Sequence, residues 1–199
     1  MSMRELTVLG QPAPERADAA RNRRRILQAA ERLFTDRGVA GVSMDDVAAA
    51  AGLGKGTLYR RFGDKAGLGI AVLDEREREL QDAILHGPPP LGPGAAPRKR
   101  LKAFVHAYLG YAWRNLELLV VAETGSPGAR YRSGVYVGFR RHVELLLIDA
   151  GADDPALAAE LILVPLAGDF LRYLAVDREL ERDAIRASLL RLTARLARA

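Results

Sequence analysis

Apolar residues recur along most of the chain at the three- and four-residue spacing of an α-helix. Ile26, Ala30, Leu33 and Phe34 form one such face, and it is followed by Gly38, the residue type favoured just beyond a helix C-terminus. No stretch alternates between apolar and polar residues as a half-buried strand does. The pattern predicts an all-α chain of about nine helices.

A short second helix is predicted over residues 44–51. Ser43 is suited to its N-cap, and Asp46 lies three residues further on, in the position that completes a capping box. Gly52 ends the helix. A third helix begins near Gly54 or Lys55, so a tight glycine turn joins the two.

The third helix buries Leu58 and Phe62, which are four residues apart, and it ends at Gly63. Asp64 is positioned to cap a fourth helix. This helix begins unusually, because Gly67 and Gly69 each cost about 1 kcal/mol relative to alanine inside a helix. The two glycines indicate either a softened first turn or a packing requirement.

Later helices are separated by glycine and proline. The connector from Gly87 to Pro97 precedes a helix over residues 98–115, and LELLVVAE at residues 116–123 either continues that helix or forms its own. A further amphipathic helix closes at Gly151. Asp154 and Pro155 then start a helix that reaches about Leu174, with a kink expected at Pro165. The last helix carries leucine and isoleucine at near-heptad spacing.

The charge of the chain is uneven. The net charge is +5 over 199 residues, and the stretch from Arg16 to Lys65 holds 11 basic residues against 6 acidic ones. The remainder, from Ala66 to Ala199, is nearly neutral, with 18 basic residues against 17 acidic ones. The basic excess predicts an N-terminal segment that faces a polyanion.

Several function classes are disfavoured. There is no cysteine, the three histidines are far apart, and no Ser/His/Asp set argues for catalysis. We therefore expect no metal, no cofactor and no enzymatic activity. The chain shows no secretory signal and no apolar run long enough for a bilayer, so we expect a cytoplasmic protein without a membrane partner.

The stretch AGLGKGTLYRRFGDK, residues 51–65, has the glycines and lysine of a phosphate-binding segment. A nucleotide-binding loop requires G-x-x-x-x-G-K-[ST] after a strand, but Gly56 follows Lys55, and Ala49 occupies the place of the first glycine. A dinucleotide fingerprint fails in the same way, since the glycines are spaced G-x-G-x-G. The phosphate of DNA is the better match.

Two capped helices joined by a glycine turn form a helix-turn-helix, whose second helix enters the major groove. With Leu58 buried, Gly56 and Arg60 point away from the core. Arg60 is best placed to reach a guanine edge, and Lys55, at the helix N-terminus, is the second candidate for a base contact. The predicted DNA contacts are Ser43, Lys55, Gly56, Thr57, Tyr59, Arg60, Arg61 and Lys65. The basic run from Arg21 to Arg25 is a further candidate for the backbone or minor groove.

The segment SMDDVAAAAGLGKGTLYRRFGDK resembles the N-terminal domain of the TetR family of bacterial transcriptional repressors, over about Arg21 to Leu73. The resemblance implies an all-helical homodimer that binds a palindromic operator. It also implies a divergent C-terminal domain in which a small molecule alters the spacing of the two DNA-reading heads. We expect a flexible arm over residues 1–18, a DNA-binding domain over 19–65, and a ligand-binding and dimerisation domain over 66–199.

Aromatic and polar residues of the middle helices are candidates for an apolar or aromatic effector: His106, Tyr108, Trp113, Glu123, Tyr136, Phe139, Asp169 and Phe170. The stripe on the last helix and the helix before it are candidates for the dimer interface: Leu161, Ile185, Leu189, Leu192 and Leu196. Two rival classes stay open, a small-molecule enzyme and an architectural DNA-binding protein without an effector. Whether the effector releases or promotes DNA binding also stays open.

Overall fold

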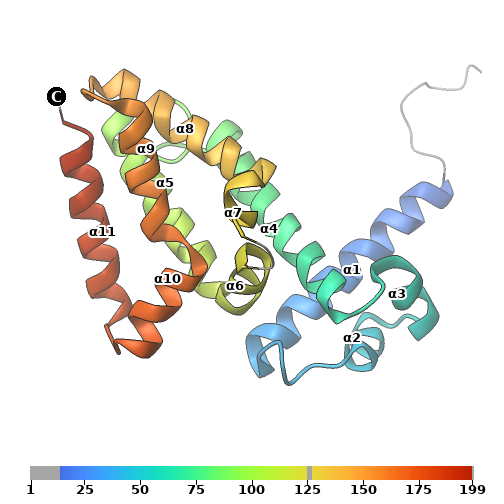
Figure 1. Ribbon diagram of the computed structural model, residues 1–199. Helices are drawn as coiled ribbons and strands as arrows, with labels where there is room; N and C mark the ends of the chain where they lie inside the picture. Colours follow the sequence, from blue (N-terminus) through green and yellow to red (C-terminus); the bar gives the residue numbers. More distant parts are fainter. Residues whose placement is uncertain (1–13, 125–126, 199) are drawn as a thin grey trace, which may run out of the picture. The chain divides into compact units, whose positions relative to one another are not determined.

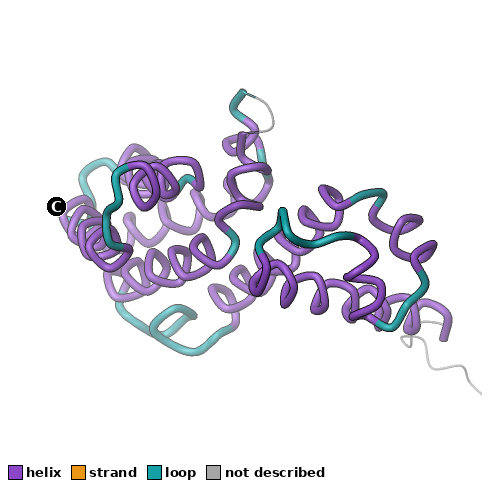
Figure 2. The backbone as a smooth tube through the Cα atoms, turned by 90° about the horizontal axis from the view of Figure 1, so that it is seen from below, coloured by secondary structure: helices purple, strands orange, loops and turns teal. Residues whose placement is uncertain are grey.

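The computed structural model describes residues 14–124 and 127–198. Among these residues the chain is built from helices and loops, without a strand (Figure 2). The all-α prediction is therefore confirmed. The chain divides into two compact units that meet within one helix, between Ala71 and Val72.

The first unit contains three helices and the start of a fourth: α1 (Pro14–Arg37), α2 (Met44–Ala51), α3 (Lys55–Phe62) and α4 (Lys65–His86) (Figure 1). Helix α2 packs against α1 and α3. The core of the first unit contains Ile26, Val47, Leu58 and Leu68, each fully shielded from solvent. Ile26 and Leu58 are positions that the helical spacing selects, whereas Phe62, also expected to be buried, is only half-buried.

The start of α1 differs from the prediction. Residues 14–18, expected to belong to the arm, form the first turns of α1, while residues 1–13 of the predicted arm lie outside the described residues. Pro14 is compatible with this start, because the first N–H groups of a helix have no intrahelical partner and a proline there forfeits no bond.

The second unit contains the rest of α4 and seven further helices: α5 (Pro97–Arg114), α6 (Leu116–Thr124), α7 (Ala129–Arg132), α8 (Gly134–Ala150), α9 (Pro155–Leu163), α10 (Gly168–Arg172) and α11 (Arg182–Leu196). Helix α5 packs against both α8 and α11, and α9 packs against α8 and α11 (Figure 1). Phe104, Leu109, Val143 and Leu147 are fully buried where α5 and α8 meet.

The described residues contain eleven α-helices rather than about nine, and the difference has two sources. The helix expected from Asp154 to Leu174 is broken at Pro165 into α9, a 3-10 turn (Val164–Leu166), α10 and a π-helical turn (Tyr173–Asp177). Proline lacks the N–H that would continue the helix. The other addition is α7, a single turn too short to show periodicity.

Helix α6 is separate from α5, which settles the choice left open by the sequence. Asn115 ends α5, and its side-chain Nδ2 donates to the carbonyl oxygen of Tyr111 at 2.8 Å. Asn115 is buried, so this bond satisfies a polar group that would otherwise be stranded in the core.

Gly67 is explained by packing. A Cβ at this position would lie 2.2 Å from the carbonyl oxygen of Phe62, closer than any real contact. Gly67 N donates to Asp64 Oδ1 at 2.8 Å, which confirms Asp64 as the cap of α4. The glycine therefore lets the chain turn tightly from α3 into α4.

Candidate nucleic-acid interface and interior polar cluster

The capping box of α2 fixes the first half of the helix-turn-helix. Ser43 Oγ accepts from Asp46 N at 3.1 Å, and Asp46 Oδ2 accepts from Ser43 N at 2.9 Å. The hydrogen bonds from Ser43 hold the pKa of Asp46 below its ordinary value. Gly52, with φ of 63°, closes the helix in the left-handed conformation, which turns the chain toward α3.

Helix α3 presents an open outer face. Leu58 is fully buried beneath it, whereas Tyr59 is 50% exposed and Arg60 is also exposed. A Cβ at Gly56 would meet no atom within 4 Å, so this position faces open space. Arg60 makes no hydrogen bond or ion pair with any residue in the described part of the chain. Gly56 and Arg60 therefore lie as the helical wheel predicts.

The other predicted DNA contacts already have partners within the first unit. Lys55 pairs with Asp45, whose hydrogen bond raises the pKa of Lys55. Arg61 Nη1 donates to the carbonyl oxygen of Ala19 at 2.8 Å. The first of these bonds fixes the N-terminus of α3, and the second ties α3 to α1.

Lys65 Nζ donates to the carbonyl oxygens of Val39 at 3.0 Å and Ala40 at 3.4 Å. In the basic run of α1, the Arg23 guanidinium lies 5.8 Å from the centroid of the Phe62 ring. These cations position the loops and helices around α3, which leaves Gly56, Thr57, Tyr59 and Arg60 as the part of the interface open to a partner.

The second unit contains a buried polar cluster centred on Arg130, a residue of α7. Arg130 is 7% exposed and forms an ion pair with Glu123, which comes from α6. Its Nη2 donates to the carbonyl oxygen of Leu163 at 3.0 Å, and its Nη1 donates to the Tyr108 hydroxyl at 3.2 Å. Only its Nε is buried without a partner. The guanidinium thus joins α5, α6, α7 and α9.

Aromatic rings surround this cation. The Cζ atom of Arg130 lies 5.2 Å from the centroid of the Tyr136 ring. The Tyr136 hydroxyl donates a hydrogen bond to Glu160. Tyr108 packs edge-on against Phe139 at 5.6 Å between ring centroids. Burial raises the pKa of Tyr108 and of Tyr136, so both phenols keep their protons for donation.

Four of the predicted effector residues therefore lie together: Tyr108, Glu123, Tyr136 and Phe139. Glu123 also accepts from Gly168 N at 2.7 Å, which links the cluster to α10. Sequence reasoning missed Arg130 at its centre. An arginine in a short turn between glycines and serine looks solvated, and nothing in the local pattern indicates its burial.

The other four candidates lie elsewhere. His106 is exposed on α5, and Asp169 and Phe170 are exposed on α10. Trp113 faces α11, where the Arg182 guanidinium lies 5.2 Å from the ring centroid. None of these residues shares a described hydrogen bond or ring contact with Arg130.

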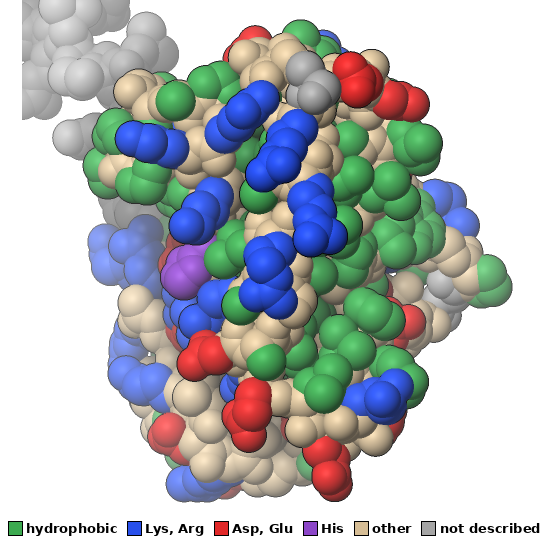
Figure 3. Space-filling model, turned by 90° about the vertical axis from the view of Figure 1, so that its left-hand side faces the viewer, with side chains coloured by type: hydrophobic (Ala, Val, Ile, Leu, Met, Phe, Trp, Pro, Cys, Tyr) green, Lys and Arg blue, Asp and Glu red, His purple; other side chains and the backbone are tan. Residues whose placement is uncertain are grey.

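The predicted dimer residues divide into two groups. Ile185 and Leu189 lie in the core of their own chain, at 4% and 9% exposure, and Leu196 packs against that core. Leu161 is 47% exposed and Leu192 is 38% exposed. The near-heptad stripe is thus largely intramolecular, because α11 packs on α5 and α9. Figure 3 shows exposed apolar side chains gathered on this side of the second unit.

No helix in the described part of the chain is both long and apolar enough to cross a membrane. Nor do the described residues gather three or more potential metal-binding side chains at one place.

Residues 26–72 match the family model described as bacterial regulatory proteins, tetR family. An HTH-type transcriptional regulator of Staphylococcus aureus is 44% identical over 71 residues, which make up 36% of this chain and 37% of that protein. The chain thus matches little more than a third of that relative's length.

Two solved structures are similar over nearly the whole fold. A putative TetR-family regulator from Rhodococcus sp. is 21% identical with a TM-score of 0.64, and the match covers 89% of this chain and 99% of that one. A putative transcriptional regulator from Saccharomonospora viridis, solved with choline, is 22% identical with a TM-score of 0.66, over 85% and 94% of the two chains. All three of these proteins are named as regulators and none as an enzyme. Residues 26–72 therefore match the tetR family of bacterial regulatory proteins, and the chain as a whole has a fold similar to that of the two solved regulators.

Proposed function

We propose that this chain is a cytoplasmic repressor that binds a palindromic DNA operator as a homodimer and responds to a small effector. The observation that carries the proposal is the outer face of α3, where Arg60 is exposed beside Gly56 and has no hydrogen bond or ion pair among the described residues. An arginine in this place can donate two hydrogen bonds to guanine O6 and N7 in the major groove. Glycine allows the helix backbone to come close to the duplex.

The remaining cations support a division of roles. Lys55, Arg61 and Lys65 are held by Asp45, Ala19 and the turn at Val39. Their charges attract phosphate whatever the sequence, while their fixed positions set the register of α3. Thr57 and Tyr59 on the flanks of α3, and Ser43 at the N-terminus of α2, are further phosphate contacts. Arg60 is the residue that carries sequence preference.

The cluster around Arg130 is the effector site in this proposal. Tyr108, Tyr136 and Phe139 supply rings for an apolar or aromatic ligand, and Glu123 supplies a polar anchor. Because the cluster joins six helices of the second unit, α5 to α10, a ligand that rearranges it would displace several helices together. The Saccharomonospora viridis protein, which shares the fold, was solved with a small molecule.

The dimer in this proposal forms through the exposed apolar residues of α9 and α11, Leu161 and Leu192. Changing both to glutamate is expected to convert the dimer to a monomer in sedimentation velocity, because charges would then be buried without partners. Leu85→Glu on α4 is the matched control, since Leu85 is 60% exposed and lies on a different helix. Equal sedimentation of the two variants would remove this surface from the proposal.

The function itself is tested by selecting bound sequences from a random duplex pool at physiological salt. The proposal predicts one inverted-repeat motif for the wild-type chain and loss of that motif for Arg60→Ala. Recovery of no motif, with binding that vanishes on modest addition of salt, would leave only phosphate attraction and contradict operator reading.

A further inference from the structure

A groove runs along the outer side of α5. It consists of two neighbouring cavities, of about 320 Å³ and about 530 Å³, which share His106 and Ala107. Both volumes lie in the range of small-molecule sites, ~300–1,000 Å³. The groove does not include the residues of the Arg130 cluster, so it is a separate place on the second unit.

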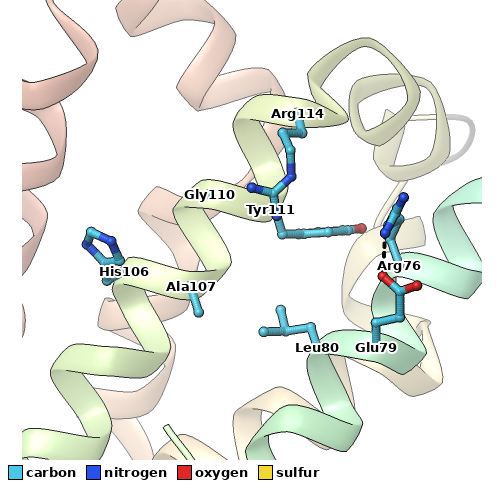
Figure 4. Close-up of a pocket in the computed structure, with 8 residues that line it drawn as sticks. All are labelled: Arg76, Glu79, Leu80, His106, Ala107, Gly110, Tyr111 and Arg114. Carbon is cyan, nitrogen blue, oxygen red and sulfur yellow. Dashed lines mark hydrogen bonds and ion pairs between the residues drawn. The ribbon is translucent and has the colours of Figure 1, made fainter. Parts of the chain in front are cut away.

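The groove exists because α5 is lined with small residues on this face. Ala103, Ala107 and Gly110 lie about one helical turn apart and leave a trough beside the larger side chains. Leu80 of α4 forms one wall of the first cavity (Figure 4). Pro90 and Leu91, from the connector that precedes α5, form the apolar wall of the second cavity.

The rim of the groove is strongly basic. Arg76 and Arg114 line the first cavity, Lys99 and Lys102 line the second, and Glu79 is the one acidic residue of either lining. Arg76 pairs with Glu79. Within the described part of the chain, Lys99, Lys102 and Arg114 have neither a hydrogen bond nor an ion pair through their side chains.

The surroundings reinforce this charge. Helix α5 contains no acidic residue, and α11, which packs against it, adds the exposed Arg191 and Arg195. Figure 3 shows Lys and Arg side chains gathered on the side of the unit where α11 lies. The exposed lysine and arginine side chains of α5 and α11 give this part of the second unit positive charge, which attracts anions.

We propose that the groove binds a single-chain amphiphile with an anionic head group, a fatty carboxylate or an alkyl phosphate. The head group lies between Arg76 and Arg114, which approach the first cavity from α4 and α5 beside Tyr111 (Figure 4). Guanidinium groups match the paired oxygens of such a head group. The alkyl chain runs over Ala107 and past His106 into the apolar cavity at Pro90 and Leu91.

In this arrangement the two cavities bind different parts of the ligand. The first cavity has the two arginines, whereas the second has proline, leucine and alanine, with lysine stems at its edge. Lysine stems cover apolar surface while their ammonium groups stay in water. A cationic amphiphile of the same length would place its charge beside Arg76 and Arg114, of which Arg76 pairs with Glu79, so the groove should prefer an anionic head group to a cationic one.

The test is isothermal titration calorimetry of the full chain, without DNA, with three probes of equal chain length below their micelle concentrations: dodecanoate, dodecyl phosphate and dodecyltrimethylammonium. We expect one anion bound per chain and no measurable binding of the cation. Preference for dodecanoate or for dodecyl phosphate identifies the head group, and either preference supports the site. Absence of binding by both anions, or equal binding of the cation, overturns it.

Two variants place the binding in the groove. Arg114→Gln removes one charged donor and is expected to lower the affinity for the anionic probe tenfold or more. Ala103→Phe fills the apolar cavity and is expected to abolish binding of the probe. Arg141→Gln is the matched control, since it removes an exposed arginine of α8 that does not line the groove, and the affinity of this variant should stay within about twofold of wild type. Unchanged affinity in both groove variants, each shown to be helical by circular dichroism, overturns the proposal. DNA binding enters none of these measurements, so the result is independent of the proposed function.

Discussion

Arg60 in the first unit and Arg130 in the second show two uses of the same side chain. Arg60 is exposed on a short helix and has no described partner, whereas Arg130 is buried and bonded to Glu123, Tyr108 and Leu163. A buried arginine requires partners because its desolvation is costly, and an exposed one does not. The unpaired arginine is therefore the one available for recognition, and the paired one holds the fold together.

The largest expected effect is a loss of stability when the buried arginine, Arg130, is replaced. Arg130→Met leaves Glu123 buried without its cation, and should lower the free energy of unfolding by about 3–5 kcal/mol. Urea denaturation followed by circular dichroism measures it. Arg195→Met, at an exposed site, is the control and should change stability by less than about 0.5 kcal/mol.

Combining Arg130→Met with Glu123→Leu should recover part of the loss, since no buried charge then remains. Equal stability of Arg130→Met and Arg195→Met would show that the cluster does not hold the second unit together.

The second expected effect is a loss of sequence preference in DNA binding when Arg60 is replaced. Arg60→Ala should lower affinity for the selected operator by about 1–3 kcal/mol while affecting random DNA little. Lys65→Ala should lower the affinity for both kinds of DNA by similar factors, because the lysine charge is proposed to meet phosphate. Fluorescence anisotropy titrations of both duplexes measure the two ratios, and equal loss of preference in the two variants would contradict the division.

Two glycines of the first unit, Gly67 and Gly56, differ in the space around them and should respond differently to replacement by alanine. Gly67→Ala drives a Cβ into the Phe62 carbonyl and should destabilise the protein by about 1–3 kcal/mol. Gly56→Ala meets open space and should stabilise α3 by about 0.5–1 kcal/mol. Thermal denaturation measures both changes. Gly56→Ala should nevertheless weaken operator binding, and unchanged DNA affinity would show that the duplex does not approach this position.

The smallest effect concerns the pH dependence of the second unit. Burial, and then the charge of Arg100, lowers the pKa of His142 to about 4 from an ordinary value of 6.5. The unfolded chain therefore binds a proton more readily, so the stability that the neutral ring provides is complete above pH 6.5 and is lost as the pH falls toward 4.

His142→Phe should lose less stability than wild type between pH 7 and pH 5 in urea denaturation. The difference should be modest because His142 is in part solvated. Identical losses in the two proteins would contradict the assignment.

The two units also differ in how much of their structure can be predicted from sequence. In the first unit the signals are local: Ser43 and Asp46 cap α2, Gly52 ends it, and Leu58 sets the face of α3. Each acts within a few residues, so the helix-turn-helix and the open position of Arg60 follow from the pattern.

In the second unit the decisive contacts join distant residues. Arg130 meets Leu163, 33 residues away, and Glu123 meets Gly168, 45 residues away, so their burial has no local signature. The apolar stripe with Ile185 and Leu189 predicts an interface, but both residues are buried in the core of their own chain. Periodicity identifies an apolar face but does not say which surface covers it.

The proposed contact between Arg60 and a base is the feature on which operator recognition depends. It is tested most directly by a double-mutant cycle on the selected operator, in which wild type and Arg60→Ala are titrated against the operator and against versions with one guanine pair exchanged in each half-site. If Arg60 contacts a guanine, exchange at one position should weaken binding by wild type by about 1–3 kcal/mol and leave binding by Arg60→Ala unchanged. Exchange costs that are the same for both proteins at every position would contradict it.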